Sequence, residues 1–151
     1  MQTKKLVIAI LAFALLVPLT VSKATVGVRL GTYTDAEELF IGAEYLAPVA
    51  NHTYINPNIE YVFVENSTFL TFNLDLHYDF VETERIFLWA GGGLGIQYFD
   101  FEGDDNSSTE AGLNLLLGLG FIPQGDFIPY IQGKAILGDY DDFVLGIGVR
   151  F

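Results

Sequence analysis

The nine residues Phe143-Val144-Leu145-Gly146-Ile147-Gly148-Val149-Arg150-Phe151 decide the fold. Strict alternation of large apolar residues with small or polar ones predicts a β-strand with one apolar face. The apolar parity holds Phe143, Leu145, Ile147, Val149 and Phe151. The stretch also ends on an aromatic residue, as the closing strand of a membrane β-barrel does where it meets the interface. We therefore expect it to be the last strand of such a barrel.

The first 24 residues have the organisation of a cleaved secretory signal peptide. Lys4 and Lys5 form a charged start, residues 6–19 an apolar core, and Ser22-Lys23-Ala24 a small-residue cleavage site. The apolar core is short for a membrane-spanning helix. The mature chain, residues 25–151, is then predicted to be one domain.

Seven further segments of the mature chain alternate in the same way, each about as long as a tilted membrane strand requires. Turns rich in Asp, Asn, Gly and Pro separate them. With the last strand, the pattern predicts an all-β fold, an eight-stranded antiparallel up-and-down transmembrane β-barrel. An even strand number places both ends of the barrel on one side, which we expect to be the periplasm. The segments are Val26–Tyr33, Glu38–Leu46, Asn56–Val64, Thr68–Asp79, Ile86–Phe99, Ala111–Phe121 and Phe127–Leu137.

A soluble ligand-binding barrel is the alternative fold, with its apolar face turned inward. The polar parity argues against it, because this parity is crowded with glycines, which make room inside a narrow barrel, and has about one charge per strand. The apolar parity has no charge in mid-strand, as a lipid-facing surface requires. Phe40, Trp89 and Leu116 have inward parity and are expected to fill the lumen or mark bulges. Aromatic residues predicted to form interfacial girdles are Tyr33, Tyr45, Tyr78, Phe99, Phe121, Phe143 and Phe151.

Composition excludes several classes of function. Removal of the signal peptide leaves four basic residues against nineteen acidic ones, a net charge of −15. Such a chain is a poor ligand for nucleic acid, whose affinity depends on Lys and Arg. The chain has no Cys, so neither a disulfide framework nor a lipid-modified cysteine is expected.

The inward parity also carries charges that we expect to form an ion network in the lumen. Eight strands leave an interior just wide enough for side chains to fill, and unpaired buried charges cost several kcal/mol each. Paired charges in a plugged lumen are therefore preferred to a narrow ion path. Arg29, Glu44 and Arg150 are expected to meet near the closing seam, joined by Asp75. The full predicted set is Arg29, Glu44, Glu60, Asp75, Lys134 and Arg150.

No metal, cofactor or catalytic group is predicted. Asp75, His77 and Asp79 share one strand face, but solvated or ion-paired groups near the barrel rim are preferred to a metal site. The acid-rich loop within residues 100–110 leaves divalent-cation binding open, because such cations take oxygen ligands. A Ser–His–acid site is disfavoured, since all mature serines lie on predicted outer loops and both histidines lie toward the periplasm.

The signal peptide, the eight amphipathic strands and the terminal Phe151 resemble the small outer-membrane β-barrel superfamily that includes OmpX and the OmpA membrane domain. The resemblance covers the mature chain and is one of pattern. It implies an integral protein of the bacterial outer membrane, in contact with lipid that includes lipopolysaccharide. It also implies that the alternating residues of the last strand, Phe143 to Phe151, form the signal recognised by the barrel assembly machinery. We expect a monomer with a non-enzymatic envelope or interaction role. A narrow pore or a lipid conduit is the alternative, and a lipid-modifying enzyme comes third.

Overall fold

A computed structural model describes residues 25–103, 106–122 and 126–151. The signal-peptide prediction falls on residues 1–24 and lies outside the described residues. The described chain forms eight antiparallel strands in one closed barrel, with neighbours in sequence order and β8 pairing with β1. The strands are β1 (Thr25–Tyr33), β2 (Glu38–Ala50), β3 (Thr53–Val62), β4 (Ser67–Glu82), β5 (Ile86–Phe101), β6 (Ser107–Phe121), β7 (Ile128–Gly138) and β8 (Asp142–Arg150).

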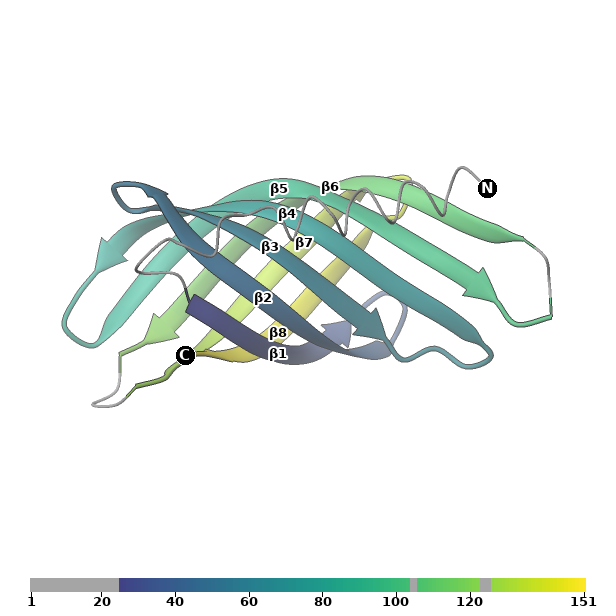
Figure 1. Cartoon of the computed structure of the whole chain (residues 1–151), viewed down its shortest axis with the longest axis horizontal. Helices are drawn as coiled ribbons and strands as arrows, with labels where there is room; N and C mark the ends of the chain where they lie inside the picture. The colour runs from purple at the N-terminus through teal and green to yellow at the C-terminus, as the bar shows by residue number, and fades with distance from the viewer. Residues whose placement is uncertain (1–24, 104–105, 123–125) are drawn as a thin grey trace.

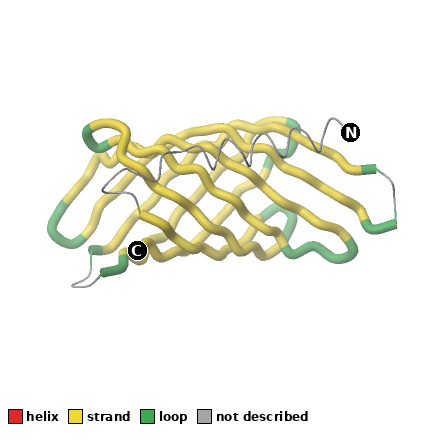
Figure 2. Tube along the Cα trace, in the orientation of Figure 1, coloured by secondary structure: helices red, strands yellow, loops and turns green. Residues whose placement is uncertain are grey.

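The eight predicted strands and the up-and-down barrel are confirmed. The strands are strongly tilted around the barrel, and the connections between them lie at its two ends (Figures 1 and 2). We call the end that holds the start of β1 and Phe151 the termini end, and the opposite end the loop end. In the ranges that the structure describes, no helix has the length and hydropathy needed to cross a membrane.

Three predicted boundaries are wrong in detail. Pro48 was expected in a turn, but β2 continues through it with a register shift between Pro48 and Ala50, and the turn lies at residues 51–52. Pro57, expected near a strand start, lies inside β3 opposite Leu74. The acid-rich loop is shorter than predicted because β5 runs to Phe101 and β6 starts at Ser107. The extended part of β6 includes Thr109, a residue type enriched in strands.

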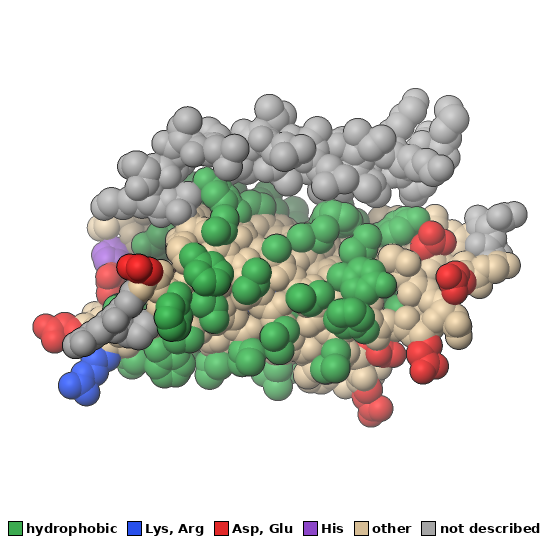
Figure 3. Space-filling model, turned by 60° about the horizontal axis from the view of Figure 1, so that its bottom comes forward, with side chains coloured by type: hydrophobic (Ala, Val, Ile, Leu, Met, Phe, Trp, Pro, Cys, Tyr) green, Lys and Arg blue, Asp and Glu red, His purple; other side chains and the backbone are tan. Residues whose placement is uncertain are grey.

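The two faces of the wall are assigned as the alternation predicts. Leucine, isoleucine and valine side chains of the apolar parity are exposed on the outside, about half accessible at Leu30, Leu117 and Ile147. Figure 3 shows these hydrophobic side chains over the middle of the wall and acidic side chains at the ends. Phe40, Trp89 and Leu116 are buried in the lumen and fill it. Trp89 also borders a bulge, because the register of β4 against β5 shifts between Asp79, which lies opposite Trp89, and Val81.

Glycines of the inward parity lie directly across the strand pair from large lumen side chains. A Cβ at Gly118 would come within 2.1 Å of the Trp89 indole, and one at Gly120 within 2.2 Å of the Phe87 ring. The same holds for Tyr130, whose ring covers Gly148. Each large side chain therefore fills the space that its glycine partner leaves, which packs the narrow interior.

Candidate functional site: the filled lumen

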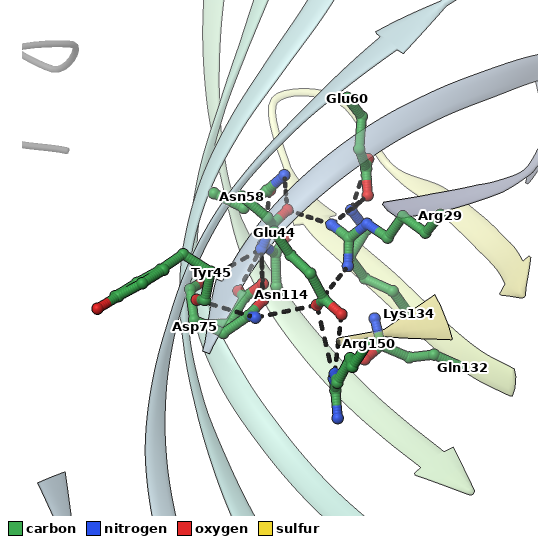
Figure 4. Close-up of polar contacts among 12 residues, drawn as sticks. Arg29, Glu44, Tyr45, Asn58, Glu60, Asp75, Asn114, Gln132, Lys134 and Arg150 are labelled. Atoms are coloured by element: carbon green, nitrogen blue, oxygen red, sulfur yellow. Dashed lines mark hydrogen bonds and ion pairs between the residues drawn. The ribbon is translucent and has the colours of Figure 1, made fainter. Parts of the chain in front are cut away.

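Glu44 of β2 is the carboxylate of the charged network that reaches the closing seam of the barrel. It lies opposite Gly27 of β1, and Gly27 lies opposite Arg150 of β8. A Cβ on Gly27 would sit 2.8 Å from Glu44 Oε1, so the glycine lets the carboxylate cross β1. There Glu44 Oε1 accepts a hydrogen bond of 2.8 Å from Arg150 Nε. This pair ties β2 to β8 across the seam (Figure 4).

Glu60 of β3 holds the other two cations of the lumen. Its Oε1 lies 2.6 Å from Arg29 Nη2, and its Oε2 lies 2.9 Å from Lys134 Nζ. It also accepts hydrogen bonds from the hydroxyl groups of Tyr33 and Thr71. Arg29 completes the connection between the two carboxylates, because its Nη1 lies 3.8 Å from Glu44 Oε2.

Asp75 joins the network through neutral side chains and not through a cation. Among the described residues no cation pairs with it. Instead its two oxygens accept hydrogen bonds of 2.9 Å from the side-chain amides of Asn58 and Asn114. Asn58 in turn accepts a hydrogen bond from Arg29, so Asp75 reaches the network through an amide.

Four asparagines complete the network, and sequence reasoning missed them. Their side chains are buried and bond one another or the carboxylates: Asn56 donates to Glu44 at 2.9 Å, and Asn114 donates to Asn73 at 2.8 Å. The available signal was the placement of Asn on the inward parity of strands, where Asn is normally depleted. The members are Asn56, Asn58, Asn73 and Asn114.

The network as a whole is formally neutral and buried. It holds three cations and three carboxylates, and each of the six side chains is at most 4% exposed. Removal of such charges from water costs several kcal/mol per ion unless partners and hydrogen bonds compensate. The ion pairs and amide hydrogen bonds above supply such partners to all three carboxylates.

Aromatic side chains surround Arg150 toward the termini end. Its guanidinium lies 4.7 Å from the Trp89 ring and 4.4 Å from the Tyr130 ring, within cation–π range. The Trp89 indole N–H donates to Gln132 at 3.2 Å. His77, predicted to be solvated or ion-paired near the rim, is instead 1% exposed and stacks on Trp89. His77 lies opposite Gly91 of β5 in the register.

An apolar plug fills the lumen toward the loop end. Its buried members are Tyr33, Phe40, Val62, Phe69, Ile136 and Val144, with Phe99 and Tyr140 packed against them. Tyr33 and Phe99 were predicted as outward girdle residues, and this is wrong, because both share the parity of the lumen-facing Gly31 and Gln97. Tyr78, Phe121, Phe143 and Phe151 are exposed on the outer wall, and Tyr45 is half-buried there.

The Asp142 carboxylate holds two loops together by hydrogen bonds at the loop end of the plug. It accepts hydrogen bonds from the backbone N–H groups of Asp35 and Phe143, at 2.9 and 2.7 Å, and from the Tyr140 hydroxyl at 2.9 Å. Burial, followed by this hydrogen bond to Asp142, raises the pKa of the Tyr140 hydroxyl. The first and last loops are therefore tied together over the β8–β1 seam.

Little space remains between the charged network and the apolar plug. A cavity beside Arg29, Glu60, Tyr130 and Lys134 holds about 10 Å³. One water molecule needs at least about 10–15 Å³ on this measure. Side chains therefore fill this part of the interior.

The groups considered for chemistry lie apart. Ser67, Ser107 and Ser108 are in strand ends at the loop end, whereas His52 and His77 lie toward the termini end. Asp79 is half-buried near the rim, away from the amide partners of Asp75. Within the described ranges no three His, Cys, Asp or Glu side chains are grouped as metal ligands.

The alternating residues of the last strand lie on the outer wall. Phe143, Leu145 and Ile147 are between 45% and 54% exposed, and Phe151 is 60% exposed. Their role as an assembly signal stays a prediction.

Three solved structures share this architecture. The N-terminal β-barrel domain of Pseudomonas aeruginosa OprF matches with a TM-score of 0.71 and 15% identity, over 85% of this chain and 96% of that one. The fold is that of the small outer-membrane β-barrels. Neisserial surface protein A matches with a TM-score of 0.63 and 14% identity, over 84% and 92% of the two chains. Ail, the attachment invasion locus protein of Yersinia pestis, matches with a TM-score of 0.54 and 18% identity, over 85% and 96%. No protein-family model and no curated protein matches the chain. At these sequence identities, the similarity supports a shared fold but does not support a shared activity.

Proposed function

We propose that this small outer-membrane barrel is an integral, monomeric, non-enzymatic protein that supports the envelope and keeps its lumen closed. The observation that carries the proposal is the filled interior. A neutral ion and amide network occupies the middle, an apolar plug lies above it, and the cavity between them holds about 10 Å³. A closed lumen leaves the outer wall and the loops as the surfaces available for function.

The outer wall supports contact with lipid, lipopolysaccharide included. Among the described residues, charged side chains are confined to the lumen and the two ends, as a hydrocarbon-facing surface requires. The loop end then faces the cell exterior, and the last strand is offered to the barrel assembly machinery.

The loop end does not suit an anionic ligand. Ail was solved in complex with the heparin analogue sucrose octasulfate. Here the described residues of the loop end include ten acidic side chains and no Lys or Arg: Asp35, Glu37, Glu38, Glu65, Asp100, Glu102, Glu110, Asp139, Asp141 and Asp142. Like charges across an interface oppose binding, so a polysulfated partner is excluded from this proposal.

A narrow pore is the second candidate, favoured by the charged residues along the lumen axis. The pore would need the apolar plug and the Arg29–Glu60–Lys134 contacts to open together. The packing of Tyr140 on Phe69 and Phe99, fastened by Asp142, opposes this.

The proposal is tested by membrane fractionation and by the phenotype of a deletion strain. The protein should sediment with the outer membrane and migrate differently on gels before and after heating. The deletion strain should become more sensitive to detergents without accumulating a modified lipid. A soluble periplasmic protein, or an altered lipid A profile restored by the wild-type gene alone, would contradict the proposal.

A further inference from the structure

Strand β6 extends farther than its neighbour β7 at the loop end. Residues Ser107–Ala111 pair with β5, in a register that places Thr109 opposite Tyr98. The pairing of β6 with β7 begins only at Gly112, opposite Gly138. In the described part of the chain, no strand pairs with residues 107–111 on the β7 side. The β5–β6 hairpin accordingly projects toward the right-hand end of Figure 1.

The backbone geometry of β6 determines which N–H and C=O groups face the side on which no strand is paired. In an antiparallel strand, the N–H and C=O of alternate residues point to the same side. The Ala111 carbonyl points toward β7, because it accepts a hydrogen bond of 3.3 Å from Asp139 N–H. The backbone groups of Thr109 and Ser107 therefore point to the same side, above β7. Both residues are exposed, so the edge is open to a further strand.

The negative charge around this edge favours a cationic partner strand. Glu110 lies between Ala111 and Thr109, and its backbone groups bond β5. On the open side it therefore occupies a non-hydrogen-bonded position, where the side chains of a paired strand approach most closely. Asp139, exposed like Asp141, adjoins the edge through its bond to Ala111. A cationic residue on an added strand, opposite Glu110, would be stabilised by these carboxylates.

We propose that residues 107–111 of β6 form a docking edge for an extended, Lys- or Arg-rich peptide segment of another protein. The segment adds as an antiparallel strand above β7. Backbone hydrogen bonds to Ser107 and Thr109 supply affinity, and the acidic loop end supplies specificity. This inference is independent of whether the lumen is closed.

The test uses the mature protein in detergent micelles and a blocked nine-residue peptide that alternates Lys and Thr. Amide hydrogen exchange is measured by NMR with and without the peptide. The amides of Ser107 and Thr109 should become protected, whereas those of Ser108 and Glu110 should not change, because they already bond β5. Binding should weaken as salt is added. Binding without protection of Ser107 and Thr109 would show a merely electrostatic association and overturn the proposal.

Variants at the edge supply the second readout. Thr109→Pro removes the N–H on the open side and leaves the β5–β6 bonds intact, so we expect peptide affinity to fall about tenfold. Thr109→Val keeps that N–H and should bind within about twofold of the wild type. Glu110→Gln should weaken binding and reduce its salt dependence. The proposal fails if Thr109→Pro, with its heat-dependent gel shift intact, binds as tightly as Thr109→Val, or if a peptide alternating Glu and Thr binds equally well.

Discussion

Glu44→Gln should destabilise the barrel by removing the only carboxylate that pairs with Arg150 in the described structure. Arg29 loses its weaker contact of 3.8 Å but keeps Glu60 at 2.6 Å. Arg150 loses its contact of 2.8 Å and is left between the Trp89 and Tyr130 rings. Breaking a buried pair by removing one partner costs about 3–5 kcal/mol. We expect a loss in this range in the free energy of unfolding in detergent, measured by urea titration with Trp89 fluorescence.

Two controls make this prediction specific. Glu65→Gln is the same chemical change on an exposed carboxylate at the loop end, and it should alter stability by no more than about 0.5 kcal/mol. The double change Glu44→Leu with Arg150→Met removes both charges together and should cost less than Glu44→Gln alone. Equal, near-zero effects of Glu44→Gln and Glu65→Gln would refute the buried pair.

Three further predictions concern packing and orientation. Gly118→Ala should destabilise the barrel by about 1–3 kcal/mol in the same urea titration, because the new Cβ would meet the Trp89 indole at 2.1 Å, whereas Gly133→Ala on the outer wall, with its nearest contact at 3.3 Å, should be nearly neutral. Similar losses for both would contradict the Gly–Trp packing. Trp89, the only tryptophan, is fully buried, so its fluorescence should resist acrylamide quenching until urea unfolds the barrel, and ready quenching in the folded state would refute its placement. Glu102→Cys should react with an impermeant maleimide on intact cells and Glu84→Cys should not, and the reverse pattern would invert the proposed orientation.

The strand number, the barrel and the direction of each face were predictable because alternation is a local property. A period of two fixes which side chains share a face, wherever the register later falls. The predictions for Tyr33 and Phe99 were wrong because they ignored this period. Their position at strand ends suggested an interfacial girdle, whereas their parity already placed them in the lumen. Strand ends were less predictable, because residues such as Ser107 and Thr109 fit a loop or a hairpin equally well.

The partners within the lumen were only partly predictable, because they depend on register across several strands. The meeting of Glu44 with Arg150 follows from short turns and from closure of β8 on β1. Asp75 was placed in the network by its parity and its charge, and its hydrogen-bond partners in the structure are the amides of Asn58 and Asn114. Counting charges in the sequence does not reveal neutral partners of this kind. A side-chain amide can nevertheless satisfy a buried carboxylate oxygen, which would be costly to leave without a hydrogen bond.

Conductance of the purified wild-type protein in planar lipid bilayers tests the closed lumen most directly. The cavity of about 10 Å³ and the plug around Phe69 predict that insertion produces no steady ion current above the bare bilayer. Reproducible single-channel steps from the folded, heat-modifiable protein would contradict the account.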